Sequence, residues 1–389
     1  MSFSRDARLF LLSSALGSFA GSFNGLYFNL YLNGLGYGQD WIGLLTSISS
    51  LVIVASALPF VFLAGSFGYK RLLLLGMGLQ GASIMLPALW PMRGWLVLAA
   101  FLGGLGGAMG AVVGGPLLAE LTDERSRTQL FGIQSGIAVL AGMAGSALAG
   151  LLPGLFTRLF HLPPQEPQTY RAVILTSFFL YLFSFLPLLR LRSGEAKVPF
   201  PFTAFRSYRR FVWDLALING LIGLGAGLLI PFVNIFFRLR FSMPDYLLGL
   251  VFALNSLLIG LGNLASPFLG RRFGRIRVVV LCQALSLPFF FLWGYVPILS
   301  LSVVGYLVRA TLMNLAGPLF SVVVMESVSP GFRPSASAVN LISWQGGWAL
   351  GALLSGFVQV RFGFAPLFPA TVILYSVAIA LTHQAFRGR

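Results

Sequence analysis

The chain repeats a set of glycine, proline and charged residues at a spacing of 206 positions along its 389 residues. Gly43 and Gly150 in the first half recur as Gly249 and Gly356 in the second half. The same spacing relates further pairs: Gly17 and Gly223, Gly68 and Gly274, Arg71 and Arg277, Pro91 and Pro297, Glu120 and Glu326, and Arg127 and Arg333. A repeat of half the chain predicts two structurally similar bundles related by pseudo-symmetry.

The composition places these two bundles in a membrane. Hydrophobic residues make up 57% of the chain and charged residues only 9%, whereas a soluble domain carries about 25% charged residues. The net charge of +16 falls in short clusters between apolar runs. The sequence has no basic stripe with interleaved aromatic residues, so nucleic acid is not an expected partner. The single cysteine, Cys282, excludes an intrachain disulfide.

Apolar runs of about 20 residues are long enough to cross a bilayer. Twelve such runs predict an all-α membrane protein with twelve transmembrane helices. The predicted domains are a six-helix bundle over residues 1–190 and a second over 211–389, joined by a charged cytoplasmic linker at 191–210. The expected spans are 9–33, 41–66, 72–90, 95–119, 129–152, 171–190, 211–237, 245–269, 277–296, 298–325, 334–360 and 364–386.

Lysine and arginine residues are distributed unevenly between the two sides of these spans. If the N-terminus is cytoplasmic, most of the 26 basic residues lie on the cytoplasmic side, and a minority, including Arg158 and Arg238, lie on the external side. The positive-inside rule therefore predicts that both termini are cytoplasmic. We expect a multi-pass protein of a bacterial-type plasma (inner) membrane, in contact with membrane lipids.

The short loops after the second and eighth predicted spans combine a glycine with a basic tail. Residues 65–71 read GSFGYKR, and residues 271–277 read RRFGRIR. Together with two six-span halves and a basic linker, these loops resemble the major facilitator superfamily, whose loop has the pattern G-x-x-x-D-R-x-G-R-[KR]. The family's Asp is replaced here by Gly65 and Arg271. The resemblance implies that two bundles expose one central site alternately to each side of the membrane, as in a secondary transporter.

Charged residues near the predicted cytoplasmic face are candidates for a gate. Glu120 ends the fourth span and Arg71 begins the third, and their repeat equivalents are Glu326 and Arg277. We expect two pseudo-symmetric ion pairs that close the cytoplasmic side. Alternatively, these are loop charges that follow the topology rule, since exposed pairs contribute only about 0–1 kcal/mol. The full predicted gate consists of Arg71, Glu120, Arg127, Arg277, Glu326 and Arg333.

Arg309 lies near the middle of the tenth span. A charge at that depth costs about 2.5–3.5 kcal/mol on insertion scales, and such residues usually face a cavity or a partner. All ten acidic residues fall in loops or near span ends, so no carboxylate is placed to neutralise Arg309. An anionic group of a substrate is therefore one expected partner. The alternative is a structural arginine that carbonyl groups, Asn side chains or water satisfy.

The resemblance implies that spans 1, 4, 7 and 10 line a central cavity, with contributions from spans 2, 5, 8 and 11. Polar and aromatic residues on these spans would combine amide groups, aromatic rings and one cation, which suits an amphipathic or anionic solute. For each of them, helix packing is the competing interpretation. The predicted substrate-binding residues are Arg309, Asn24, Tyr31, Gln134, Asn219, Asn255, Asn340 and Trp344.

Secondary transport of a small organic molecule, with efflux favoured, is the function expected from these features. The alternatives are a lipid or lysolipid translocator and a non-transporting membrane receptor on the same fold. We expect no enzyme activity, catalytic residue, metal or cofactor, and we expect a monomer. Coupling to a proton or another ion remains open, because the sequence places no carboxylate at mid-depth and the nearest candidates are Asp214, Glu120 and Glu326.

Overall fold

The computed structural model describes residues 3–122, 124–191 and 208–387, with the side chains of residues 124, 125 and 128 excepted. Within these ranges the chain is helical and contains no strand. Most of the predicted linker at 191–210 lies outside the described residues. The helices are α1 (Arg5–Gly34), α2 (Gln39–Phe67), α3 (Tyr69–Leu89), α4 (Arg93–Glu120), α5 (Glu124–Phe160), α6 (Pro167–Phe183), α7 (Phe185–Leu189), α8 (Arg209–Leu229), α9 (Val233–Phe241), α10 (Asp245–Phe273), α11 (Arg275–Tyr295), α12 (Leu299–Glu326), α13 (Arg333–Phe362) and α14 (Leu367–Phe386).

The prediction of twelve membrane spans is confirmed for the described part of the chain, where twelve helical stretches are long and apolar enough to cross a bilayer. Two spans consist of consecutive helices: α6 with α7, and α8 with α9. The 3₁₀ turn Ile230–Phe232 separates α8 from α9. Pro231 lies in this turn, and proline interrupts a helix because it has no N–H to donate and clashes with the preceding turn.

Glycine allows the chain to turn sharply between consecutive spans at two repeat-related positions. Gly68 separates α2 from α3, and Gly274 separates α10 from α11. Their φ angles are +80° and +86°, a region that residues with a Cβ rarely adopt. The glycine of the family-like loop therefore has a backbone role in both halves.

The chain forms two compact units. Unit 1 comprises Met1–Gly38, Ile48–Val198 and Asn234–Ser256, and unit 2 comprises Gln39–Ser47, Pro199–Val233 and Leu257–Arg389. Each unit thus contains most of one half of the sequence and a short segment of the other half. The division of the chain into bundles at 1–190 and 211–389 stays a prediction.

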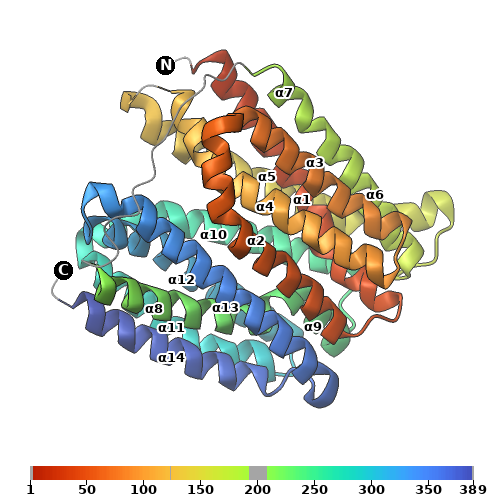
Figure 1. Ribbon diagram of the computed structural model, residues 1–389. Coiled ribbons are helices and arrows are strands. Elements are labelled where there is room, and N and C mark those ends of the chain that lie inside the picture. The colour runs from red at the N-terminus through yellow and green to blue at the C-terminus, as the bar shows by residue number, and fades with distance from the viewer. Residues whose placement is uncertain (1–2, 123, 192–207, 388–389) are drawn as a thin grey trace. The chain divides into compact units, whose positions relative to one another are not determined.

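Within each unit, helices approach closely where glycine removes the side chain. In unit 1, a Cβ added to Gly76 of α3 would lie 2.8 Å from the Met109 Cβ of α4. In unit 2, a Cβ added to Gly351 of α13 would lie 2.9 Å from the Gly227 Cα of α8. Figure 1 shows α8, α13 and α14 side by side in unit 2, where α8 packs against both of the others. The seam between α8 and α13 joins the helices that carry the predicted residues Asn219, Asn340 and Trp344.

Candidate functional site

The segment from Asn234 to Ser256, which we call the junction segment, comes from the second half of the sequence but belongs to unit 1. It contains α9, a short loop and the first part of α10. The amide Nδ2 of Asn234 donates a hydrogen bond of 2.8 Å to the carbonyl oxygen of Leu26 in α1. Phe236 and Phe237 in α9 are buried. Apolar burial and this hydrogen bond therefore hold the junction segment against first-half helices.

A first glycine crossing joins α5 to the junction segment. A Cβ added to Gly150 would lie 2.8 Å from the Gly249 Cα and 3.0 Å from the carbonyl oxygen of Asp245. A Cβ added to Gly249 would lie 2.7 Å from the carbonyl oxygen of Ser146. Non-bonded carbon atoms have their optimal separation near 3.5–4.0 Å, so the two helices can approach this closely only because both residues are glycine.

A second glycine crossing lies within unit 2, between Gly43 of α2 and Gly356 of α13. A Cβ added to Gly43 would lie 3.3 Å from the Gly356 Cα, and one added to Gly356 would lie 2.8 Å from the Asp40 Cα. Beside them, the Ser47 hydroxyl donates a 2.6 Å hydrogen bond to the carbonyl oxygen of Ala349. Gly43 is the repeat equivalent of Gly249, and Gly356 that of Gly150. The two crossings are therefore the same contact made twice under the 206-residue repeat.

Four side chains form a charge cluster where the junction segment meets α1 and α6. The Asp245 carboxylate accepts hydrogen bonds from Arg238 of α9 and, at 3.2 Å, from the Tyr170 hydroxyl of α6. The Tyr170 ring stacks on the Tyr27 ring of α1, with centroids 5.0 Å apart. Only 13% of the Arg238 side chain and 11% of the Asp245 side chain are exposed. Breaking such a buried pair leaves an uncompensated charge and is strongly destabilising.

The charge cluster leaves several polar atoms without a hydrogen-bond partner among the described residues. They are the Tyr27 hydroxyl and the Nε and Nη1 atoms of Arg238, all of which are buried. Arginine stays charged at any physiological pH. The positive charge of Arg238 therefore depends on Asp245 for its compensation.

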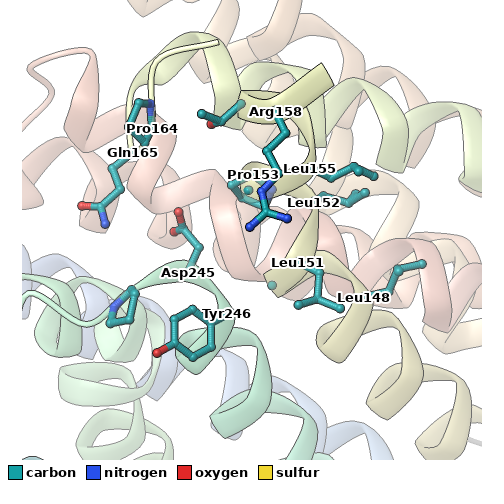
Figure 2. Close-up of a pocket in the computed structure, with 14 residues that line it drawn as sticks. Leu148, Leu151, Leu152, Pro153, Leu155, Arg158, Pro164, Gln165, Asp245 and Tyr246 are labelled. Atoms are coloured by element: carbon teal, nitrogen blue, oxygen red, sulfur yellow. The ribbon is translucent and has the colours of Figure 1, made fainter. Parts of the chain in front are cut away.

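A groove of about 720 Å³ lies beside this cluster, within unit 1. Figure 2 shows Asp245 and Tyr246 of α10 on one side of it and Arg158 of α5 on the other. Most of its remaining wall is apolar and comes from α5: Leu148, Leu151, Leu152, Pro153 and Leu155. The groove can thus hold an apolar chain next to a cation.

Arg309, which the sequence predicts to bind the substrate, contacts neighbouring helices of unit 2. Its side chain is buried, and its Nη2 donates a 2.8 Å hydrogen bond to the Tyr375 hydroxyl of α14. Its guanidinium carbon lies 4.7 Å from the centroid of the Phe290 ring of α11. These contacts favour the structural alternative, although the partners are a phenol and an aromatic face rather than carbonyl groups, Asn side chains or water.

The other predicted substrate-binding residues are divided between the two units. In unit 1, Gln134 donates to the Ser14 hydroxyl at 3.0 Å, and the Tyr31 hydroxyl donates to the carbonyl oxygen of Pro87. Asn24 and Asn255 each have a buried side-chain oxygen with no partner among the described residues. In unit 2, the Asn219 amide donates a hydrogen bond to the carbonyl oxygen of Leu215 in its own helix. Asn340 is partly buried, and the Trp344 ring stacks on the Trp348 ring. Their role in substrate binding stays a prediction.

The predicted cytoplasmic gate takes a different form in unit 2. Glu326 pairs with Arg275 and not with Arg277, and both partners are largely exposed. Arg275 is the first residue of α11 and lies beside the end of α12, whereas Arg277, two residues on, projects from another side of the helix. Arg333 donates from Nε to the carbonyl oxygen of Met325. The expected Arg277–Glu326 pair is therefore corrected to Arg275–Glu326.

In unit 1, the expected partners Arg71 and Glu120 make no ion pair among the described residues. Arg127 is exposed. The gating role of these charges in either half stays a prediction.

Sequence reasoning missed the charge cluster. It placed Arg238 among external charges and Asp245 among acids near span ends, because nothing in the sequence around them indicates burial. The nearest signal is Asn234, a polar residue within an apolar run between Pro231 and Phe237. Its hydrogen bond to α1 belongs to the same packed segment.

Comparison with known proteins identifies the family. The model of the Major Facilitator Superfamily matches residues 9–352. No curated protein matches the sequence. Solved structures of three transporters share the fold. A bacterial homologue of the human lysosomal transporter Spinster, in an inward-facing and occupied conformation, is 16% identical with a TM-score of 0.77, and the match covers 98% of this chain and 96% of that chain. A mutant of the nucleoside transporter NupG is 17% identical with a TM-score of 0.74 (98% of this chain and 99% of that chain covered), and the human organic anion transporter MFSD10, or TETRAN, is 18% identical with a TM-score of 0.64 (97% and 99% covered).

Proposed function

This chain belongs to the major facilitator superfamily, a family of transporters, and we propose that it is a secondary active transporter that exports a small organic solute across the plasma membrane by alternating access. The proposed solute is amphipathic or anionic. Both bundles are present in one chain, so we propose that a monomer suffices, with both termini in the cytoplasm. The family and the similar solved structures are transporters, so we propose transport and not catalysis for this chain.

The observation that carries this proposal is the pair of equivalent glycine crossings. Each crossing joins a helix from the first half of the sequence to a helix from the second half. Small residues let helices in lipid approach through their backbones. A contact without interlocking side chains can separate and re-form at little cost. Two symmetry-related contacts of this kind are what an alternately opening end of a carrier requires.

The chemistry of the solute is proposed from the predicted binding residues. Asn24, Gln134 and Trp344 offer amide groups and an aromatic face, which suit a solute with an apolar body and a polar head. Arg309 was the predicted partner for an anion, but Tyr375 and Phe290 already contact it. We therefore place the amphipathic character of the solute ahead of its negative charge.

Translocation of a lipid or lysolipid is a second candidate, which the groove beside α5 and α10 favours. Its leucine-rich wall can accompany an acyl chain, and Arg158 can face an anionic headgroup. Asp245, on the opposite side, is already paired with Arg238. The groove therefore presents Arg158 as its uncompensated charge among the described residues.

A ligand screen followed by a flux assay tests both candidates. Ligands that bind the folded state raise its apparent stability by mass action, so purified protein is heated with organic anions, lysolipids, sugars and cationic drugs. Each stabilising compound is then tested for flux in proteoliposomes. Flux of a soluble amphipathic compound supports the first candidate, and flux confined to lysolipids supports the second. Stabilisation by sugars alone, with sugar flux, would contradict both.

A further inference from the structure

Among the acidic residues whose side chains the structure describes, Asp245 stands out because it joins a mostly buried ion pair. Its partners are Arg238 of α9 and Tyr170 of α6, and Tyr27 of α1 stacks on Tyr170. Both hydrogen bonds end on Oδ1. The Oδ2 atom is therefore the carboxylate oxygen that remains available to a proton.

We propose that the carboxylate of Asp245 is a proton-binding site, and that a proton bound there releases the junction segment from α1, α5 and α6. This inference rests on the proposed alternating access, because it assigns a ligand to one of the contacts that must open. The sequence had offered Asp214, Glu120 and Glu326 as the nearest candidates for proton coupling. We choose Asp245 instead, because its side chain is mostly buried, it has a charged partner, and it lies at a contact that opens in the proposed cycle.

The charged and titratable groups around Asp245 set the sign of the effect. Arg238 and Tyr170 contact the carboxylate, Tyr27 lies behind Tyr170, and Arg158 lies across the groove. Glu166, at the start of α6, interacts electrostatically with Tyr170 but is exposed. Burial disfavours the charged form of Asp245, whereas the Arg238 guanidinium and the hydrogen bond from Tyr170 favour it in the closed arrangement. A bound proton must displace this pairing with Arg238.

Protonation of Asp245 removes the compensation of Arg238. The guanidinium group then remains charged, and two of its nitrogen atoms are buried without a partner among the described residues. A buried unpaired charge is strongly unfavourable, and the charge regains water if the junction segment moves away. The open arrangement therefore binds the proton more tightly than the closed one. By linkage, acidity favours the open arrangement.

The groove gives the proton a path to this site. Asp245 lines the groove together with Arg158 and Tyr246, so its carboxylate can be reached without prior opening of the Gly150–Gly249 crossing. The predicted topology places this end of the helices on the external side. Acidification of the external side is therefore the condition that should open it.

A cysteine reporter in the junction segment measures its release. Ala253 of α10 is 5% exposed, and Ala253→Cys on a Cys282→Ser background provides one buried thiol. The full chain is reconstituted in vesicles of phosphatidylcholine and phosphatidylglycerol and labelled with a polar maleimide at one fixed neutral pH. Asp245→Asn, which mimics the protonated side chain, should raise the labelling rate by on the order of tenfold. Glu166→Gln, which neutralises a nearby exposed carboxylate, should leave the rate unchanged.

A second variant separates the charge mechanism from a general loss of packing. Asp245→Asn combined with Arg238→Met leaves no buried charge, so labelling should return toward the rate of the parent. Equal labelling of Asp245→Asn and the parent overturns the proposal. Rapid labelling that Arg238→Met does not reverse also overturns it, because the effect then comes from lost contacts and not from an unpaired charge.

Proton binding itself is read by infrared spectroscopy of the same reconstituted protein. Between neutral and acidic pH, the parent should gain a protonated-carboxyl band that Asp245→Asn lacks, and the absence of this difference overturns the assignment of the proton to Asp245. Gly150→Val is the control for alternating access. If it raises labelling and Asp245→Asn does not, only the proton site fails. If neither variant changes labelling, the alternating-access proposal fails as well.

Discussion

Arg309 shows how burial of a charge in a membrane protein can be resolved inside the fold. Its guanidinium group lies against the Phe290 ring and donates to the Tyr375 hydroxyl. A cation over an aromatic face gains about 0.5–2 kcal/mol, with the larger values when it is desolvated. Aromatic residues on two other helices thus supply partners for this buried arginine, while its Nε atom has no hydrogen-bond partner among the described residues.

Tyr375→Phe should destabilise the protein by about 1–3 kcal/mol, because it leaves an N–H of the Arg309 guanidinium buried without an acceptor. Arg309→Met combined with Tyr375→Phe should cost less than the sum of the two single changes, since it removes both partners. Thermal unfolding in detergent measures this, with Tyr246→Phe at an exposed site as the control. An unchanged stability of Tyr375→Phe together with weakened ligand binding would instead support Arg309 as a substrate residue.

Gly68 offers a separate test of backbone conformation, because a Cβ there would meet no atom within 4 Å although φ is +80°. Gly68→Ala should cost about 1–3 kcal/mol, because φ +80° with ψ 147° is a conformation that residues with a Cβ rarely adopt. Gly78→Ala has the same open space but lies within α3, where alanine is favoured over glycine by about 0.5–1 kcal/mol. Opposite shifts in thermal stability are therefore expected, and equal shifts would contradict a backbone role for Gly68.

Helix pairs in this protein differ in how firmly their surfaces interlock. The crossing of α5 with α10 depends on two glycines, and the junction segment adds the hydrogen bond from Asn234 to α1. Overpacking a close contact costs about 1–3 kcal/mol. A single side chain added at a crossing is therefore enough to change which arrangement of the helices is favoured.

Gly150→Val should destabilise the closed crossing and expose the Ala253→Cys thiol, because its Cβ would lie 2.8 Å from the Gly249 Cα. Gly154→Val is one helical turn further along α5, where a Cβ would meet no atom within 4 Å, and it should leave labelling near the parental rate. Labelling of both variants in parallel provides the measurement. Similar rates for Gly150→Val and Gly154→Val would mean that the crossing does not control access to α10.

The 206-residue repeat relates the two crossings, and we expect both of them to open together in the proposed transport cycle. Gly43 and Gly356 meet in unit 2, and Gly150 and Gly249 meet in unit 1. If both open in one concerted change, a perturbation of either contact shifts the same equilibrium. The coupling free energy measures how far a change at one crossing shifts the opening equilibrium at the other crossing.

Gly43→Val, in unit 2, should therefore raise the labelling of the Ala253→Cys thiol in unit 1. Its matched control is Gly65→Val, also in α2, where a Cβ would meet no atom within 4 Å. The expected direction is that of Gly150→Val, because both changes disfavour the closed arrangement. Labelling that responds to Gly150→Val but not to Gly43→Val would show that the crossings open independently.

Apolar run length was sufficient to predict the twelve spans, because bilayer thickness fixes the length that a span needs. The resemblance of two short loops to a known motif predicted the family. Neither feature could predict that Asp245 and Arg238 are buried, that Glu326 meets Arg275, or that Arg309 meets Tyr375. These pairings depend on the tertiary structure, because a polar side chain in a bundle takes its partners from helices distant in sequence. The sequence repeat identified Gly43, Gly150, Gly249 and Gly356 as equivalent positions. Only the packing of the helices shows that Gly43 meets Gly356 and that Gly150 meets Gly249.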